Sequence, residues 1–254
     1  YGILQDVTER KLAEEKLIKL NRLYAFISAI NHSIVHIKEE DELLKKACSI
    51  AMEIGKFKTA WIGLLNEEDK LEVRDVLGEP AVVQVVKKRS GIDVQNSPFR
   101  NTGIGKALRN GIYAVSNDVL NDPDMHFLKE ELLNAGIRAN IVFHIKKSGK
   151  VTGFFSFSSD TVNFFDEAEI VLLQEAANNI SFALENFDRT ERHKIAEEKV
   201  KESELRYRSI IEQANDAICI IDASMKFIDF NPYACQVLGY TREEAMQKSV
   251  TDLL

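Results

Sequence analysis

The chain has 254 residues, of which 45% are hydrophobic and 29% charged, an ordinary composition for a globular protein with a sizeable core. Its 33 basic and 40 acidic residues give a net charge of −7, which argues against a protein that binds nucleic acid through a basic face. Three separated cysteines exclude a disulfide framework and a cysteine-rich zinc site, and we predict no metal site. With no signal peptide and no apolar run of the ~20 residues that span a bilayer, we expect a cytoplasmic location, or the cytoplasmic side of a membrane-anchored parent.

A short repeat frames the middle of the chain. TERK at 8–11 followed by AEEK at 13–16 returns as TERHK at 190–194 followed by AEEK at 196–199, with one extra residue in the second copy. Both copies are rich in Lys and Glu and hold neither Gly nor Pro, which favours helix. The sequence therefore predicts the same helical connector on both sides of a central domain.

The first connector belongs to a predicted long helix over 7–31. Asp6 and Glu9 have the spacing of a capping box at its start. Its apolar residues form two stripes, which indicates two packing partners. We expect one stripe to face the local core and the other to contact a helix of a second chain.

The central region mixes helices and strands. Its hairpin signals are the polar run 66–69 between two apolar runs, and the basic run 146–150 between two others. The predicted elements, in chain order, are a helix at 39–54, strands at 59–65 and 70–77, a mixed stretch at 79–110 with a helix over 104–109, a strand at 112–116, a short helix at 124–134, and strands at 140–145 and 151–157.

A second, very long helix is predicted over 167–214. Asp166 and Glu169 have capping-box spacing at its start. Apolar residues keep heptad spacing along it, but the phase changes between Phe187 and Ala196, where the repeat has its extra residue. Such an offset locally unwinds or overwinds a coiled coil.

The last part of the chain returns to short elements. Strands are predicted at 217–221 and 226–230, followed by a helix that starts at Asn231 and Pro232 and ends at Gly239. A third capping box begins at Thr241. Two strands and two short helices bury too little apolar area for an independent domain.

Five segments of the central region together resemble a known domain family. They are TAWIGLL at 59–65, TGIGKALRNGIYAVSNDVLNDP at 102–123, AGIRANIVFHI at 135–145, KVTGFFSFSS at 150–159 and FFDEAEIVLLQEAANNISFALEN at 164–186. Together they resemble a GAF domain over 35–186. The chain departs from the family at His144, where Pro is usual, and at Asn101. The resemblance implies an α+β fold in which an antiparallel sheet has helices on both faces.

Both ends resemble a second family. ELRYRSIIEQANDAICIID at 204–222 and FIDFNPYACQVLGYTREE at 227–244 resemble the first half of a PAS domain, and YGILQDVTERK resembles the last strand and exit motif of another. The expected organisation is a PAS end at 1–11, a helical linker with the first GAF helix at 12–34, a GAF domain at 35–186, a coiled-coil signalling linker at 187–207 and the N-terminal half of a PAS domain at 208–254.

Such arrays resemble the input regions of bacterial and archaeal sensor histidine kinases in two-component systems, and less often those of cyclic-di-GMP enzymes. The resemblance implies a module that binds a small molecule in the GAF domain. Its helices at 7–31 and 167–214 would form a parallel homodimer that relays the signal to a downstream kinase or cyclase domain. Two alternatives stay open, namely the input region of a diguanylate cyclase or phosphodiesterase, and a ligand-free dimerisation spacer.

We expect no enzyme within this chain, whereas the parent protein is expected to be a histidine kinase. His193 lies in a Lys- and Glu-rich helix and is followed by Lys-Ile-Ala, which differs from the His-Glu or His-Asp start of a phosphoacceptor motif. Nucleotide-binding, zinc-protease and Ser-His-Asp patterns are also missing from the sequence.

Strand alternation predicts the ligand site. Arg138, Asn140 and His144 share one face of their strand, and Ser156 lies on one face of the next. A partly polar face on a covered sheet fits contact with a ligand or water. By analogy with the GAF family, three further residues would lie near the cavity, so the predicted ligand-binding set is Arg138, Asn140, His144, Ser156, Asn117, Asp118 and Phe127. The alternative is that Arg138 and Asn140 only tie loops to the sheet.

The cofactor is unknown, because no bilin, haem or flavin signature is found. A bilin needs a suitably placed cysteine, and Cys48 has the apolar neighbours of a core residue. Haem needs an axial histidine, for which His126 and His144 are the candidates. A PAS flavin photoreceptor would have a cysteine near Val250.

Overall fold

The computed structural model describes residues 8–248 and residue 250. Residues 1–7 of the predicted PAS end at 1–11, including the capping residue Asp6, lie outside the described residues. The chain divides into two compact units, one ending at Arg189 and the other beginning at Thr190. Each unit is described by itself.

The first unit is built on an antiparallel sheet with the strand order β2-β1-β5-β4-β3. Both predicted hairpins are confirmed, since β1 pairs with β2 and β4 pairs with β5. The strands are β1 (Thr59–Leu65), β2 (Leu71–Leu77), β3 (Ala114–Ser116), β4 (Ala139–Lys147) and β5 (Lys150–Ser159).

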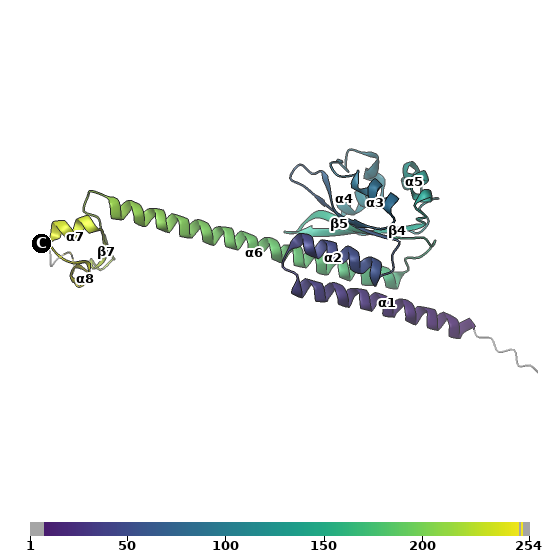
Figure 1. The fold of residues 1–254 in the computed structure, drawn as a ribbon, viewed down its shortest axis with the longest axis horizontal. Coiled ribbons are helices and arrows are strands. Elements are labelled where there is room, and N and C mark those ends of the chain that lie inside the picture. Colours follow the sequence, from purple (N-terminus) through teal and green to yellow (C-terminus); the bar gives the residue numbers. More distant parts are fainter. Residues whose placement is uncertain (1–7, 249, 251–254) are drawn as a thin grey trace, which may run out of the picture. The chain divides into compact units, whose positions relative to one another are not determined.

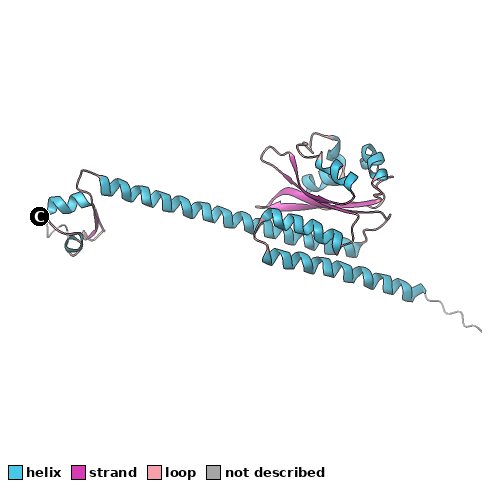
Figure 2. Cartoon of the chain, in the orientation of Figure 1, coloured by secondary structure: helices cyan, strands magenta, loops and turns pink. Residues whose placement is uncertain are grey.

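Helices cover both faces of this sheet, as Figures 1 and 2 show. One face packs against α1 (Thr8–His36), α2 (Glu40–Glu53) and the first part of α6 (Glu167–Gln213). The other face carries α3 (Pro80–Lys87), α4 (Gly103–Asn110) and α5 (Lys129–Asn134), with 3₁₀ turns at Pro98–Asn101 and Pro123–Leu128. The predicted α+β fold class is confirmed.

Helix α3 falls in the stretch whose sequence pattern did not predict a helix. Pro80 occupies its first turn, where the missing N–H costs nothing, and the preceding residue is extended. Val82 and Val86 are buried one turn apart. The helix is rich in valine, whose branched side chain lowers helix propensity, so its stability comes from packing on the sheet.

Alternation along the strands sends their side chains into two separate cores. In β4, Ile141 and Phe143 enter the core under α1, α2 and α6, which is rich in phenylalanine. Val142 enters the core under α3, α4 and α5, as does Phe154 of β5. Since Asn140 and His144 alternate with Ile141 and Phe143, their side chains lie on the α3–α5 side.

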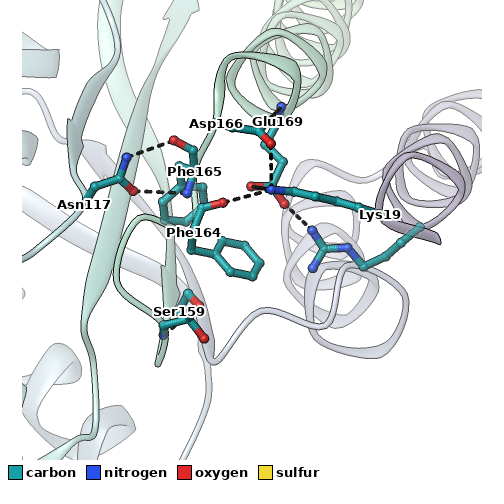
Figure 3. Close-up of polar contacts among 9 residues, drawn as sticks. Lys19, Asn117, Ser159, Phe164, Phe165, Asp166 and Glu169 are labelled. Carbon is teal, nitrogen blue, oxygen red and sulfur yellow. Dashed lines mark hydrogen bonds and ion pairs between the residues drawn. The ribbon is translucent and has the colours of Figure 1, made fainter. Parts of the chain in front are cut away.

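Helices α1 and α6 run parallel and are joined by polar contacts (Figure 3). The buried carboxylate of Glu169 contacts Arg22 and lies 2.9 Å from the Lys19 ammonium. Twelve residues further along α1, Asn31 accepts a 2.8 Å hydrogen bond from Asn179. Burial raises the pKa of the Glu169 carboxyl, and the charges of Lys19 and Arg22 counteract part of that shift.

The second unit contains the last part of α6 and four short elements. They are β6 (Cys219–Ile221), β7 (Phe227–Phe230), α7 (Pro232–Leu238) and α8 (Arg242–Ala245). The predicted caps are confirmed, since Asn231 accepts from the Ala234 N–H and Thr241 forms a capping box with Glu244. Among residues 8–248 and 250, no helix is both long and apolar enough to cross a membrane.

Candidate functional site

A cavity of about 260 Å³ lies between the sheet and helices α3, α4 and α5. Strands β1, β4 and β5 form its floor, and the three helices with the turn before α5 form its walls. Its volume is just under the ~300 Å³ at which small-molecule sites begin. The lining consists of Thr59, Trp61, Ala81, Val82, Val85, Val86, Arg89, Thr102, Ile104, Met125, Leu128, Glu131, Leu132, Asn134, Ala135, Ile137, Asn140, Ser156 and Ser158.

The polar floor of the cavity is organised by one amide. Asn140 Nδ2 has two N–H protons for three acceptors within reach, namely Ser156 Oγ at 2.9 Å, the Phe157 carbonyl at 3.0 Å and Ser158 Oγ at 3.1 Å. The strand register explains this arrangement, because Asn140 of β4 lies opposite Ser158 of β5. On the other side of β5, Ser158 lies opposite Thr59 of β1. Strands β1 and β5 thus contribute three hydroxyls to the cavity floor, and β4 contributes the amide of Asn140.

One ion pair crosses the wall of the cavity. Arg89, which follows α3, contacts the carboxylate of Glu131 in α5. The guanidinium also lies over the rings of Trp61 and Phe99, with 5.8 and 5.2 Å to the centroids. Burial lowers the pKa of Arg89, and the charge of Glu131 opposes this shift. Among the lining residues, these two are the charged ones, so the wall carries no net charge.

The structure places two of the seven predicted binding residues, Asn140 and Ser156, in the lining of the cavity. Arg138, His144, Asn117, Asp118 and Phe127 lie outside it. Sequence reasoning missed most of the lining, although alternation along β1 could have indicated Thr59 and Trp61. The lining residues of α3 and α5 had no comparable signal, because they come from separate helices.

Asn117 is a structural link at the end of β3 (Figure 3). Its Nδ2 donates to the Phe165 carbonyl at 2.9 Å, and its Oδ1 accepts from the Phe165 N–H at 3.0 Å. Asn117 therefore ties the edge of the sheet to the segment that leads into α6. The neighbouring Asp118 accepts from Asn121 Nδ2 at 2.7 Å and stabilises a turn.

Arg138 and Phe127 also make local structural contacts rather than lining the cavity. Arg138 precedes β4, where its N–H donates to the Ser159 carbonyl at 2.8 Å and its carbonyl accepts from the Val119 N–H at 2.9 Å. Phe127 is half exposed and packs edge-to-face on Phe99, with 5.2 Å between the ring centroids. The Asn140 side chain joins β4 to β5, so it does not serve as a loop tie.

His144 is buried on the cavity side of the sheet but beyond the cavity itself. It lies opposite Phe154 in the β4–β5 pairing, and its side chain is 8% exposed. Its Nδ1 makes no hydrogen bond within the described part of the chain. Burial lowers the pKa of His144, and Lys146 adds to the shift.

Replacement of His144 by Gln is expected to reduce the acid sensitivity of the first unit. The folded pKa lies below the unfolded value of 6.5, so the unfolded chain takes up a proton first. The contribution of neutral His144 to the stability of the folded protein is complete above pH 6.5, and it is lost as the pH falls from there through the pKa of the folded state. Urea unfolding at pH 7.5 and 5.5 measures the free energy of unfolding of both proteins at each pH. A stability difference between wild type and His144→Gln that is equal at both pH values would contradict the prediction.

The candidates for cofactor attachment lie away from the cavity. Cys48 of α2 is fully buried in the core on the opposite face of the sheet, and burial raises the pKa of its thiol well above 9.0. His126 is exposed in the 3₁₀ turn before α5. Neither residue lines the cavity, so neither would contact a group bound there.

The first unit is an antiparallel sheet with a cavity under one helical layer, and helix α6 continues from it into a second α+β unit. The GAF domain model matches residues 38–185, and the chain belongs to the GAF domain family. A PAS domain model matches residues 205–254. The chain is therefore a sensory region that combines a GAF domain with PAS sequence.

Two curated relatives agree with this assignment. The methyl sulfide methyltransferase-associated sensor of Methanosarcina acetivorans is 28% identical over 258 residues, covering 100% of this chain and 24% of that protein. Sporulation kinase E of Bacillus subtilis is 34% identical over 58 residues, covering 23% of this chain and 8% of that protein. The chain thus spans about a quarter of the first relative and a smaller part of the second.

Solved structures share the fold of the first unit. Free methionine-R-sulfoxide reductase from Neisseria meningitidis has a TM-score of 0.54 at 19% identity, covering 66% of this chain and 91% of that one. A GAF domain of a Coxiella burnetii phosphoenolpyruvate-protein phosphotransferase also has a TM-score of 0.54, at 10% identity, covering 68% of this chain and 98% of that one. At such identities the likeness shows the fold alone.

Proposed function

We propose that the chain is the input region of a sensor histidine kinase, on the cytoplasmic side of the cell. In this proposal a small molecule occupies the cavity of the GAF domain, and the resulting change passes along α6 in a parallel homodimer. The observation that carries the proposal is the cavity itself, which a domain acting only as a spacer does not need. A buried site of this kind, apolar with a few convergent polar groups, is typical of ligand binding.

The connection from the cavity to the output supports the relay. Strands β5 and β4 line the cavity, and β3 lies next to β4 at the edge of the sheet. Asn117, at the end of β3, holds the backbone of Phe165 immediately before α6. Helix α6 then continues without a break to Gln213, into the second unit. A shift of the sheet edge would therefore reach the start of the output helix through two hydrogen bonds.

Exposed apolar side chains support the homodimer. Leu17 and Tyr24 of α1 are about 60% exposed, and Val171 and Phe182 of α6 are each 66% exposed. Single exposed apolar residues are common, but the members of each pair are seven or eleven residues apart and so share one face of their helix, as contact with another helix requires. The same helix has further such residues in its second half, namely Ile195, Val200, Leu205, Tyr207 and Ile210.

The names of the two curated relatives, a sensor and a kinase, favour a kinase over a cyclase as the output. In the proposed mechanism the dimer has two packings of α6, and cavity occupancy shifts the population between them. The phase change in the heptad pattern between Phe187 and Ala196 is the element that would adopt both packings.

Disulfide mapping tests both the dimer and the relay. Cys219 and Cys235 are replaced by Ser, Cys48 stays buried, and single cysteines are placed in turn along 180–207. Air oxidation and gel analysis are expected to give cross-links at heptad spacing. Filling the cavity by Val85→Phe, or independently by Ala135→Phe, is expected to move the cross-linked positions, because a bulky side chain takes the place of a ligand.

The matched control is Gln84→Phe, since Gln84 neighbours Val85 but points away from the cavity lining. This variant should keep the wild-type pattern. An absence of cross-links would contradict the parallel dimer. A pattern that stays the same in both filled variants, with folding verified by cooperative urea unfolding, would contradict the relay and favour the dimerisation spacer.

A further inference from the structure

We infer that the cavity takes an uncharged, mainly apolar small molecule with one hydrogen-bond acceptor, such as a carbonyl or ether oxygen. The acceptor would lie at the end of the cavity where the hydroxyls of Thr59, Ser156 and Ser158 converge. This inference rests on the proposed function, because it names the chemical class of the ligand for that site.

The two serines offer protons. Asn140 Nδ2 lies 2.9 Å from the Ser156 hydroxyl oxygen and 3.1 Å from that of Ser158, and its two N–H protons, shared with the Phe157 carbonyl, can only be donated to these oxygens. A hydroxyl has one proton to donate, and neither serine donates it to a group in the described part of the chain. Because Asn140 fixes both oxygens, their protons are available to a third partner inside the cavity.

Thr59 provides a third hydroxyl at the same place. It lies opposite Ser158 in the β1–β5 pairing, and the residue is 2% exposed. Its hydroxyl makes no hydrogen bond within the described residues, although it lines the cavity. A hydroxyl that lines a cavity and is not used by the protein can donate its proton to an acceptor on a ligand.

The charge of the wall excludes an ionic ligand. Arg89 and Glu131 are the charged residues of the lining, and they neutralise each other. A bound anion or cation would therefore lose its water without gaining an unpaired counter-charge. Most of the remaining surface is aliphatic or aromatic, with Trp61, Val86, Ile104, Met125, Leu128 and Ile137 among its members. Such a wall favours an apolar body behind the acceptor.

The chain carries a reporter for this site, because its single tryptophan is Trp61 in the cavity wall. Four probes of similar shape separate the alternatives, namely cyclohexanone, cyclohexane, cyclohexanecarboxylate and cyclohexylammonium. Each is titrated into the full chain while the Trp61 fluorescence and its single indole N–H resonance are followed. We expect cyclohexanone to bind about fivefold more tightly than cyclohexane, as one hydrogen bond provides. The two ions should leave both signals unchanged.

Two variants test the position of the acceptor. Thr59→Val and Ser156→Ala should each weaken cyclohexanone binding about fivefold and leave cyclohexane binding unchanged. Thr152→Val is the matched control, because Thr152 lies on β5 outside the lining, and it should affect neither probe.

Three results with the probes would overturn the inference: tighter binding of either ion than of cyclohexanone, equally tight binding of cyclohexane, or no change in the Trp61 signals with any of the four probes. It would also be overturned if Thr59→Val and Ser156→Ala both bind cyclohexanone like wild type. These outcomes leave the proposed relay in place, since disulfide mapping with a filled cavity tests it without any ligand. Conversely, a cross-link pattern that does not change when the cavity is filled would contradict the relay, but it would not affect the finding that the cavity prefers a ketone.

Discussion

Replacement of Arg22 by Met is expected to lower the free energy of unfolding of the first unit by about 3 kcal/mol, the lower end of the range for breaking a buried ion pair. The fully buried carboxylate of Glu169 loses one of its two cations, and only Lys19 remains beside it. Arg22 also lies over the rings of Phe57 and Phe164, and these contacts are lost with it. Urea unfolding followed by Trp61 fluorescence measures the first unit alone, because the second unit has no tryptophan.

A second substitution identifies the cause of the stability loss in Arg22→Met. Adding Glu169→Met to Arg22→Met is expected to recover most of the lost stability, because apolar replacement of both partners leaves no buried charge unpaired. Lys70→Met is the control, since its ion pair with Glu68 is exposed and should contribute less than about 1 kcal/mol. If the double variant is no more stable than Arg22→Met, the loss comes from packing rather than from the stranded carboxylate.

Gly105→Ala is expected to destabilise the first unit by about 3 kcal/mol, in the range found for overpacked sites. A Cβ at this position of α4 would lie 2.2 Å from the Arg100 carbonyl oxygen and 2.5 Å from that of Phe99. Both are backbone atoms of the preceding 3₁₀ turn, so no side chain can rotate away. The helix would have to separate from the turn beside the cavity.

Gly103→Ala in the same helix is the matched control for this clash. Its Cβ would meet Val142 Cγ2 at 3.2 Å, a contact that a small side-chain movement relieves. Because alanine favours helix by about 1 kcal/mol over glycine, we expect this variant to be close to wild type in stability. Equal destabilisation by the two alanines, measured by the same urea unfolding, would contradict the backbone-clash account of Gly105.

The elements that the sequence predicted well have strong local signals. The strand at 59–65 matches β1 at both ends, and the long helix predicted over 167–214 differs from α6 by one residue. Such segments combine a clear hydrophobic period with a hairpin or capping signal at the boundary. Helix α3 was missed because its valine-rich sequence has β propensity, which tertiary packing overrides.

The site was harder to predict than the fold, because its residues meet only through the tertiary structure. Alternation places Asn140 and Ser156 on the cavity side, as the structure does. Arg89 and Glu131 are 42 residues apart and come together only when α3 and α5 pack on the sheet. Asn117 was predicted as a ligand residue by family analogy, whereas its amide donates to and accepts from the backbone of Phe165, 48 residues away.

The parallel arrangement of α1 and α6 has a mechanical consequence. The contacts of Lys19 and Arg22 with Glu169, and of Asn31 with Asn179, secure the two helices at points nine to twelve residues apart on α1, a span of about 14 to 18 Å at about 1.5 Å per residue. Torque or tension applied to α1 therefore passes directly to α6, without crossing the sheet. Because the cavity lies on the opposite face of the sheet from these two helices, α6 has two mechanical inputs, one directly from α1 and one through the sheet and the hydrogen bonds between Asn117 and Phe165.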